Sequence, residues 1–312
     1  MKKIRTNTIM AWDLQMYRIL HIVQGKPFII ELRLVPLDEL YIHEEVVPRN
    51  IRRLIDKFQK ERVFTHPIIV DKNSNVVLDG MHRVTALRML GNNYIPVSFI
   101  DYNHPAIQVK NWFRAIYPEN TKNMHNAIID ILSELEINSR WEDRNTFMNL
   151  LFERKYFACF RFHHMDKILA LINDENADIW SIYRKIGKIE KRIMQDLKAR
   201  IMYEPDIFIQ QESQKKEIPL VLMTPPLSKR EVVYFARQKK LFPPKTTRHI
   251  IPMRPLFINI PMILLREDGP GRDLEEKNKI FEALLRQKGV LKLRGKLLLD
   301  RFYEEDFVYL FT

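Results

Sequence analysis

Residues 76–83 constrain the fold of this chain more than any other part of its sequence. Three apolar residues lead into Asp79 and Gly80, and a helical pattern then runs to Gly91. This order predicts a buried strand, a tight turn and a helix over about residues 83–90, with Gly91 at the C′ position. Gly80 permits a positive φ and a close approach of the backbone to a ligand.

The same turn has the features of a phosphate-binding site. The first N–H groups of a helix have no partner within the helix, and the positive end of the helix dipole lies behind them. His82 and Arg83 add side-chain donors, and the guanidinium fork of Arg83 matches phosphate oxygens. Asp79 would hold Mg²⁺ or orient a hydroxyl. In the structural alternative, Asp79 only caps the helix and Arg83 is solvated.

The surrounding residues predict an α/β domain over residues 28–115. Strands are expected near residues 28–35, 67–70, 76–78 and 94–100, where apolar runs or alternation occur. Pro48 marks the first turn of a helix whose apolar residues recur at helical spacing. Residues 1–27 are expected to be a short lead-in with one helix.

Residues 116–312 predict a second domain. Residues 116–203 are expected to be mostly helical, with one strand at residues 156–162. Five isoleucines from Ile179 to Ile193 form a stripe that packs on the chain's own core or, alternatively, on a second copy. From Ile218 onward strands and helices alternate again, with a capping box from Ser228 to Glu231 and a helix and a final strand after residue 266.

The amino-acid composition limits the cellular compartments and the classes of binding partner that fit this chain. With 312 residues the chain can form one large domain or two modest ones. Its single cysteine, Cys159, excludes an intrachain disulfide and favours a reducing, cytoplasmic environment. The most apolar stretch, residues 257–265, is too short to cross a bilayer. The net charge of +12 fits nucleic acid or anionic small molecules and does not choose between them.

Cys159 also lies close in sequence to His163 and His164, which raises the question of a metal or haem site. Cys159 and His163 would share one face of a strand, but two ligands are too few for a closed metal site. The sequence therefore favours a buried thiol and surface histidines.

Two further segments carry candidate functional residues. Glu44, in the sequence His43-Glu44-Glu45, lies between the first strand and the first helix, where a carboxylate facing the Asp79–Gly80 turn would act as general base for a hydroxyl. The alternative is an ordinary surface acid. Residues 242–249 place several polar donors in a row on a loop bounded by prolines, which suits an anion site or, alternatively, a solvated basic loop.

These segments resemble known families. The Asp-Gly-x-His-Arg turn after a buried strand resembles the signature of the ParB/sulfiredoxin-like superfamily, and the match covers residues 30–114. The His43-Glu44 pair and the Pro-Lys-Thr-Thr-Arg-His segment at residues 244–249 are similar to the free L-serine kinases. This resemblance implies a mixed α/β fold. It would have a ParB/sulfiredoxin-like N-terminal domain with a small mixed sheet and a largely helical and α/β C-terminal region that completes the active-site cleft.

The resemblance also implies a kinase that transfers a phosphoryl group from ATP or ADP to free L-serine, with Mg²⁺. Glu44 would deprotonate or orient the serine hydroxyl, and Asp79 would assist through Mg²⁺ or the hydroxyl. The implied nucleotide and phosphate ligands are Gly80, Met81, His82, Arg83, Lys245 and Arg248. The implied substrate-binding residues are His43, Trp112, Thr246, Thr247 and His249. Met81 departs from the family, which has a histidine there, and residues 116–217 match it poorly.

Two alternatives stay open. The charge favours a ParB-like DNA-binding protein or nuclease, although the arginine-rich box of ParB is reduced here to His82 and Arg83 and no helix-turn-helix pattern is evident. The chain could also be a non-catalytic nucleotide-binding regulator. As a kinase it would need no membrane or nucleic acid partner and would be a monomer or homodimer.

Overall fold

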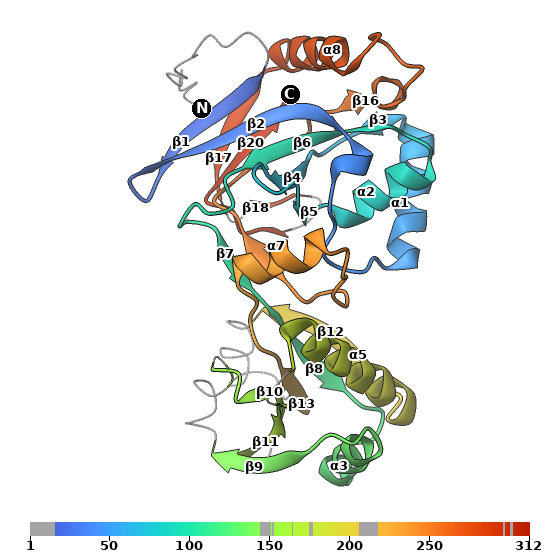
Figure 1. The fold of residues 1–312 in the computed structure, drawn as a ribbon, viewed down its shortest axis with the longest axis vertical. Helices are drawn as coiled ribbons and strands as arrows, with labels where there is room; N and C mark the ends of the chain where they lie inside the picture. Colours follow the sequence, from blue (N-terminus) through green and yellow to red (C-terminus); the bar gives the residue numbers. More distant parts are fainter. Residues whose placement is uncertain are drawn as a thin grey trace. The chain divides into compact units, whose positions relative to one another are not determined.

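The computed structural model shows two compact units (Figure 1). It describes residues 16–143, 151, 153–163, 165–174, 177–205, 218–295, 297–299 and 302–312. The first unit comprises residues 1–108, 233–239 and 249–312, and the second comprises residues 109–232 and 240–248. The units differ from the ranges that the sequence predicts as domains, because residues after 249 return to the first unit. The predicted domains, with their lead-in at residues 1–27, stay a prediction.

A mixed five-stranded sheet forms the centre of the first unit. Its order is β1 (Tyr17–Val23), β2 (Lys26–Pro36), β6 (Tyr94–Ile100), β4 (Ile68–Asp71) and β5 (Val77–Asp79). The pairing of β4 with β6 is parallel, and the other pairings are antiparallel. Every residue of β6 is buried, as expected for a strand covered on both faces. The predicted small mixed sheet and its strands are confirmed.

Strand β1 corrects the expected helix in the lead-in. Gln24 and Gly25 both have positive φ, of 50° and 74°, and form a two-residue turn between β1 and β2. A turn with two positive φ values matches the twist of a hairpin, so residues 17–23 pair with β2 as a strand. Residues 1–15 lie outside the described part of the chain.

Three helices of the first unit lie beside this sheet. α1 (Pro48–Glu61) starts at Pro48 as predicted, and α2 (Met81–Met89) starts two residues before its predicted position. Gly91 has a φ of 69° just after α2, which confirms its C′ role. α1 packs against α2, and α8 (Leu274–Arg286) packs against β2, where Asn278 bonds both backbone groups of Leu34 (Figure 1).

The C-terminal residues complete the first unit with short strands. A three-stranded sheet has the order β15 (Met253–Leu256), β20 (Phe307–Phe311) and β17 (Val290–Arg294). β16 (Ile260–Pro261) pairs with β3 (Val63–Phe64), and β18 (Leu297–Leu298) pairs with β19 (Phe302–Tyr303). Short 3-10 helices occur at Leu37–Glu39 and Met262–Leu265. The predicted C-terminal helix and final strand are confirmed as α8 and β20.

The second unit is built on a six-stranded antiparallel sheet. Its order is β12 (Arg200–Pro205), β8 (Trp112–Tyr117), β13 (Leu220–Met223), β10 (Tyr156–Phe162), β11 (Lys167–Ile172) and β9 (Ser139–Asp143). The prediction of a mostly helical region over residues 116–203 is therefore wrong. Central strands such as β11 are buried on both faces, so their apolar residues run on without the alternation that marks a strand.

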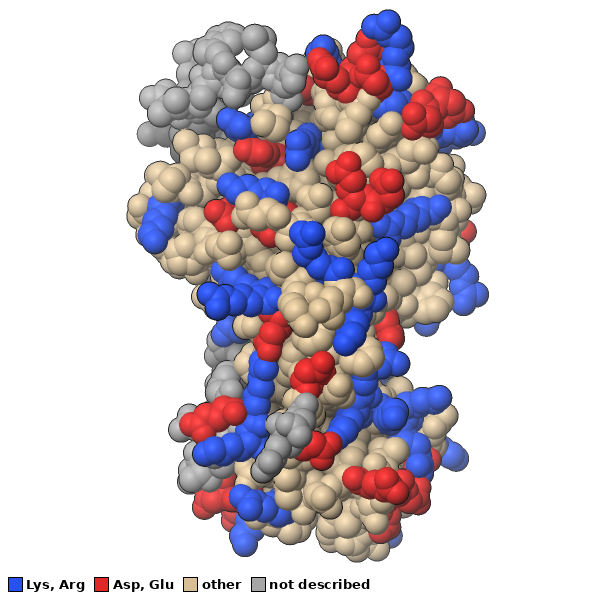
Figure 2. Space-filling view, in the orientation of Figure 1, with Lys and Arg blue, Asp and Glu red and all other residues tan. Residues whose placement is uncertain are grey.

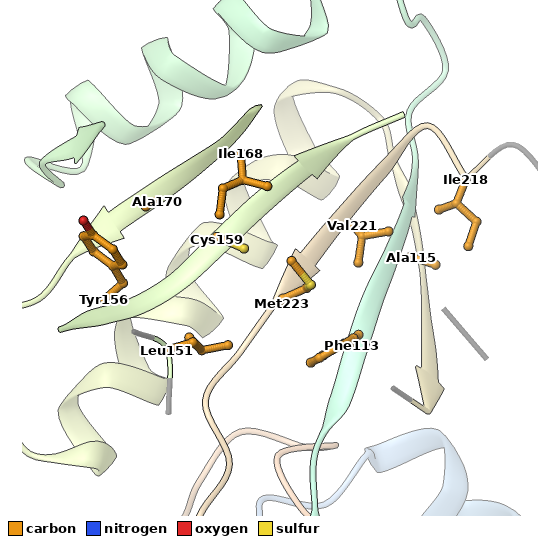
Figure 3. Packing of buried hydrophobic residues seen from close by; sticks show 10 residues of the cluster. All are labelled: Phe113, Ala115, Leu151, Tyr156, Cys159, Ile168, Ala170, Ile218, Val221 and Met223. Atoms are coloured by element: carbon orange, nitrogen blue, oxygen red, sulfur yellow. The ribbon is translucent and has the colours of Figure 1, made fainter. Parts of the chain in front are cut away.

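The core of the second unit lies on this sheet. Figure 3 shows side chains of β8, β10, β11 and β13 packed together, with Cys159 among them. Cys159 is fully buried, and burial raises the pKa of its thiol, so the predicted buried thiol is confirmed. Of its two neighbouring histidines, His164 lies outside the described residues.

The helices of the second unit include α3 (Met124–Glu134) and α5 (Ile179–Asp196), which pack against each other. All five isoleucines of the α5 stripe are buried within the chain, which confirms packing on its own core. α7 (Lys229–Arg237), of which residues 233–237 belong to the first unit, begins at the predicted capping box, where the Glu231 carboxylate accepts from the Ser228 N–H at 2.8 Å. Among the described residues, none of the helices combines the length and apolarity that a membrane crossing requires.

β7 (Gln108–Lys110) and β14 (Arg248–Ile250) pair in a two-stranded ribbon. The boundary between the compact units runs through both strands. Arg248 belongs to the second unit and His249, the next residue, belongs to the first.

Candidate active site

The turn between β5 and α2 requires glycine at position 80. Gly80 has a φ of 107° and is the N-cap of α2, which has no side-chain cap. A Cβ on Gly80 would lie 2.4 Å from Ile68 Cγ2, so even alanine would clash there. The N-cap of α2 is thus a glycine without a capping side chain, and the preceding carboxylate of Asp79 pairs with arginines.

Asp79 lies between two guanidinium groups of the first unit. Its Oδ2 accepts from Arg83 Nη2 at 3.2 Å and forms a second ion pair with Arg254 Nη1. Arg254 belongs to β15 and is buried, and its Nε donates to Glu305 Oε1. Burial by itself lowers the pKa of Arg254, but the carboxylates of Asp79 and Glu305 outweigh it and raise the pKa. Arg254 thus stays charged beside the turn.

Arg254 and Glu305 were not predicted from the sequence as part of the site. A signal was present, because an arginine within the apolar run of β15 needs a carboxylate partner if the strand is buried. The identity of that partner was not in the sequence.

Arg83 fastens the turn to the loop before β4. Its Nη1 donates to the carbonyl oxygens of His66 and Pro67, at 2.7 and 3.0 Å, while Nη2 donates to Asp79. The guanidinium group therefore already holds protein acceptors. A role for Arg83 in phosphate binding stays a prediction, and it would require some of these bonds to be exchanged.

The segment before α1 contacts the turn directly. The backbone N–H of Glu44 donates to Met81 Sδ at 3.3 Å, and that of Val47 donates to His82 Nε2 at 3.0 Å. Because a backbone N–H can only donate, His82 Nε2 must accept, and the hydrogen of the neutral imidazole lies on Nδ1. Two segments far apart in sequence are thus joined beside Asp79.

His43 lies behind Glu44 and is fully buried. Its Nδ1 lies 2.9 Å from the Val77 carbonyl oxygen, which can only accept, so Nδ1 carries the hydrogen. Burial lowers the pKa of His43, although Glu44 and the Val77 bond oppose the shift in part. In the neutral ring Nε2 is the acceptor atom, and it lies 3.9 Å from Glu44 Oε1. His43 has no exposed surface, so its predicted role in substrate binding would act through Glu44.

His249 joins this group from the C-terminal part of the first unit. Its ring stands edge-on to that of His43, with centroids 5.5 Å apart. Its Nε2 lies 2.7 Å from the hydroxyl oxygen of Tyr102, a residue not predicted as part of the site. Nothing in the sequence singles out Tyr102, which simply follows the buried strand β6.

In the second unit, Trp112 holds the predicted anion loop. Its indole Nε1–H donates to the Thr247 carbonyl oxygen at 3.0 Å. Lys245 Nζ and Arg248 Cζ lie 4.7 and 5.6 Å from the centroid of the Trp112 ring, within the range of cation–π attraction. Thr246 is fully buried and donates its hydroxyl to Pro243 O at 2.8 Å. This loop is therefore anchored through Trp112 and Thr246, while the side chain of Lys245 is exposed.

A buried charge network supports β8 next to Trp112. Arg114 is fully buried and donates from Nε to Glu190 Oε1 at 2.6 Å and from Nη1 to the Trp112 carbonyl oxygen at 2.5 Å. Tyr203 donates its hydroxyl to Glu190 Oε2 at 2.9 Å. Buried ion pairs of this kind fix geometry because removal of one partner leaves an uncompensated charge.

The described residues offer limited protein ligands for a metal. Within them, no group of three or more His, Cys, Asp or Glu side chains could hold a metal ion. Mg²⁺ commonly uses one or two carboxylates together with substrate phosphates and water. A Mg²⁺ that arrives with a nucleotide, with Asp79 as its carboxylate ligand, stays a prediction.

The surface charge does not outline a nucleic-acid groove on the face drawn in Figure 2. Lysines and arginines are interspersed there with aspartates and glutamates. On this face the basic side chains that contribute to the net charge of +12 are thus interspersed with acidic ones.

Comparison of the sequence with known proteins gives relatives of two kinds. No family model matches the chain. An ATP-dependent L-serine kinase from Staphylothermus marinus is 27% identical over 251 residues, which cover 76% of this chain and 92% of the relative. A ParB-like protein from Sulfolobus acidocaldarius is 31% identical over 220 residues, covering 70% and 90%. An ADP-dependent L-serine kinase from Thermococcus kodakarensis is 22% identical, covering 72% and 89%.

Solved structures agree on the fold. A free serine kinase in complex with AMP superposes with a TM-score of 0.63 at 20% identity, covering 75% of this chain and 93% of that one. SbnI with a C-terminal truncation, from Staphylococcus aureus, has a TM-score of 0.62 at 19% identity and covers 82% and 96%. These likenesses confirm the fold that the sequence predicts.

Proposed function

Given that this chain belongs to the family of ParB-like proteins and free L-serine kinases, we propose that it transfers a phosphoryl group from ATP or ADP to the hydroxyl of free L-serine. The product is O-phospho-L-serine. The observation that carries the proposal is the contact between the Glu44 backbone and Met81, beside Asp79 and Gly80. It supports one site with both a carboxylate for the hydroxyl and a turn for phosphates.

In this proposal, Glu44 is the general base. Phosphoryl transfer depends mainly on an oriented nucleophile and on compensation of the phosphate charge. Glu44 is buried, and its backbone is held at the turn, so its carboxylate has a restricted orientation. Gly80 and the N-terminus of α2 would bind nucleotide phosphates, because the helix dipole and the first N–H groups favour anions there.

The residues held by Trp112 would supply the remaining anion contacts. Lys245 and Arg248 bring two cations to one loop, which suits a phosphate or the serine carboxylate. Trp112, Thr246 and Thr247 are assigned to substrate binding on the family resemblance. His249 lies near His43 within the first unit, which supports its assignment to substrate binding.

The proposed reaction also involves Mg²⁺ and a cytoplasmic enzyme. Mg²⁺ bound with the nucleotide would neutralise phosphate charge, and Asp79 would be its protein ligand. The low cysteine content supports a cytoplasmic enzyme, and we expect a monomer or a homodimer.

The decisive test is incubation of the full chain with Mg²⁺, L-serine and labelled ATP or ADP. We expect labelled O-phospho-L-serine with at least one nucleotide. Glu44→Gln should reduce kcat by about 10²–10⁴-fold, as for loss of a general base, while the neighbouring change Glu45→Gln serves as the matched control. Absence of phosphoserine with both nucleotides, combined with binding or nicking of DNA, would replace the kinase by a ParB-like DNA-binding protein.

A further inference from the structure

Tyr102 is a buried residue that contacts the candidate site and has no assigned role. It is 2% exposed and follows β6. Its backbone N–H donates to Asp71 Oδ1 at 3.1 Å, and Ser74 Oγ donates to the other oxygen of the same carboxylate. The backbone of Tyr102 is thus held in place, and its hydroxyl lies 2.7 Å from His249 Nε2.

Burial keeps the hydrogen on the Tyr102 hydroxyl and so makes it a donor. Burial raises the pKa of Tyr102, and Asp71 adds to the shift, so the hydroxyl keeps its hydrogen at every working pH. A buried O–H group requires an acceptor. The Nε2 atom of His249 lies at bonding distance and accepts when the neutral imidazole carries its hydrogen on Nδ1.

We propose that Tyr102 is a positioning residue for the kinase reaction: its hydroxyl donates to His249 Nε2 and holds His249 as the neutral tautomer with hydrogen on Nδ1. His249 then offers an uncharged N–H donor to substrate or phosphate oxygen. The inference rests on the proposed function for its kinetic consequence, whereas the tautomer of His249 is a property of the protein itself.

The position of His249 explains why its orientation matters. Its ring stands edge-on to His43, and His43 Nε2 faces the carboxylate of Glu44. Tyr102 therefore fixes one end of a row of side chains that ends at the predicted base. A rotated His249 ring would lose this edge-on contact with His43.

The kinetic test is Tyr102→Phe, which removes only the hydroxyl. The matched control is Tyr94→Phe, at the other end of β6, whose hydroxyl donates to Glu267 at 2.8 Å. We expect kcat to fall about 10-fold for Tyr102→Phe, since loss of one buried hydrogen bond approaches that factor, and to stay unchanged for Tyr94→Phe. In a His249→Ala background, Tyr102→Phe should cause no further loss, because residues that act through one another are not additive. Multiplicative losses in the double variant, or full kcat in Tyr102→Phe, would overturn the proposal.

A second measurement separates this inference from the kinase assignment. The ¹⁵N chemical shifts of the His249 ring distinguish a protonated from an unprotonated ring nitrogen. At neutral pH we expect an unprotonated Nε2 in the wild-type protein and a change of tautomer population in Tyr102→Phe, with Tyr94→Phe like wild type. This result would uphold the positioning role even if serine were not the substrate, whereas a protonated Nε2 in the wild-type protein would refute it.

Discussion

Replacement of Arg254 by methionine should destabilise the protein strongly, because Arg254 compensates two carboxylates. The side chains of Arg254 and Glu305 are only 7% and 9% exposed, and their ion pair measures 2.5 Å. Removal of one partner of a buried pair typically costs about 3–5 kcal/mol, since the other charge stays buried without compensation. Asp79 adds less, because it is more exposed and keeps Arg83. We expect a loss of about 3–5 kcal/mol for Arg254→Met, measured by urea denaturation.

The double variant Arg254→Met/Glu305→Gln tests the cause of this loss. With the buried carboxylate neutralised, most of the stability should return, because replacing both partners of a buried pair is often nearly neutral. Activity should not return with it, because Asp79 would still lack its second guanidinium group. A cost below about 1 kcal/mol for Arg254→Met, or an unfolded double variant, would show that the pair does not stabilise the fold in the way described.

Three further changes test other features of the site. Gly80→Ala should lower the free energy of unfolding by about 2–4 kcal/mol, measured by thermal or urea denaturation, because the strain of a positive φ and the clash of the new Cβ add together. The control Gly91→Ala, at a φ of 69° with open space around it, should lower it by only about 1 kcal/mol. Equal losses for the two variants would contradict the clash. The pKa of His43 lies below its ordinary value of 6.5, so between the two pKa values the unfolded chain binds a proton that the folded chain does not. The stability that this histidine contributes above pH 6.5 should therefore decline as the pH falls below 6.5. His43→Asn should remove this part of the pH dependence, and an unchanged stability profile would contradict the argument. Trp112→Phe should raise KM for serine several-fold. The control Trp180→Phe loses a similar hydrogen bond, from its indole N–H to the Leu241 carbonyl oxygen at 2.9 Å, and should leave KM unchanged. Similar kinetics for both variants would remove Trp112 from the site.

The sequence predicted those elements that carry local signals. α1 begins at Pro48, which fits the first turn of a helix, and β10 has the predicted bounds at Tyr156–Phe162. The turn at residue 80 was predicted from its glycine, which permits a positive φ. The structure adds that a Cβ there would clash with Ile68. Each of these features depends on a few neighbouring residues.

Features that depend on distant partners were not predicted. The six-stranded sheet was mistaken for helices because strands such as β11 are covered on both faces and lose their alternation. β1 was missed because a Gln-Gly turn is a weaker hairpin signal than Asn-Gly. The roles of Arg254 and Tyr102 arise only when residues far along the chain come together, at Asp79 and at His249.

The division of the first unit into three chain segments has a consequence for biosynthesis. Arg254 follows Asp79 by 175 residues, so a growing chain exposes the turn long before its ion-pair partner has been translated. Contacts of such high sequence separation slow folding, and domains otherwise tend to fold from the N-terminus during synthesis. On the ribosome the second unit has all of its residues first, while the predicted catalytic turn must wait for the last strands. Nonsense mutations at positions 249–254 would therefore leave a fully translated second unit and a turn without Arg254, a product suited to degradation rather than to residual activity.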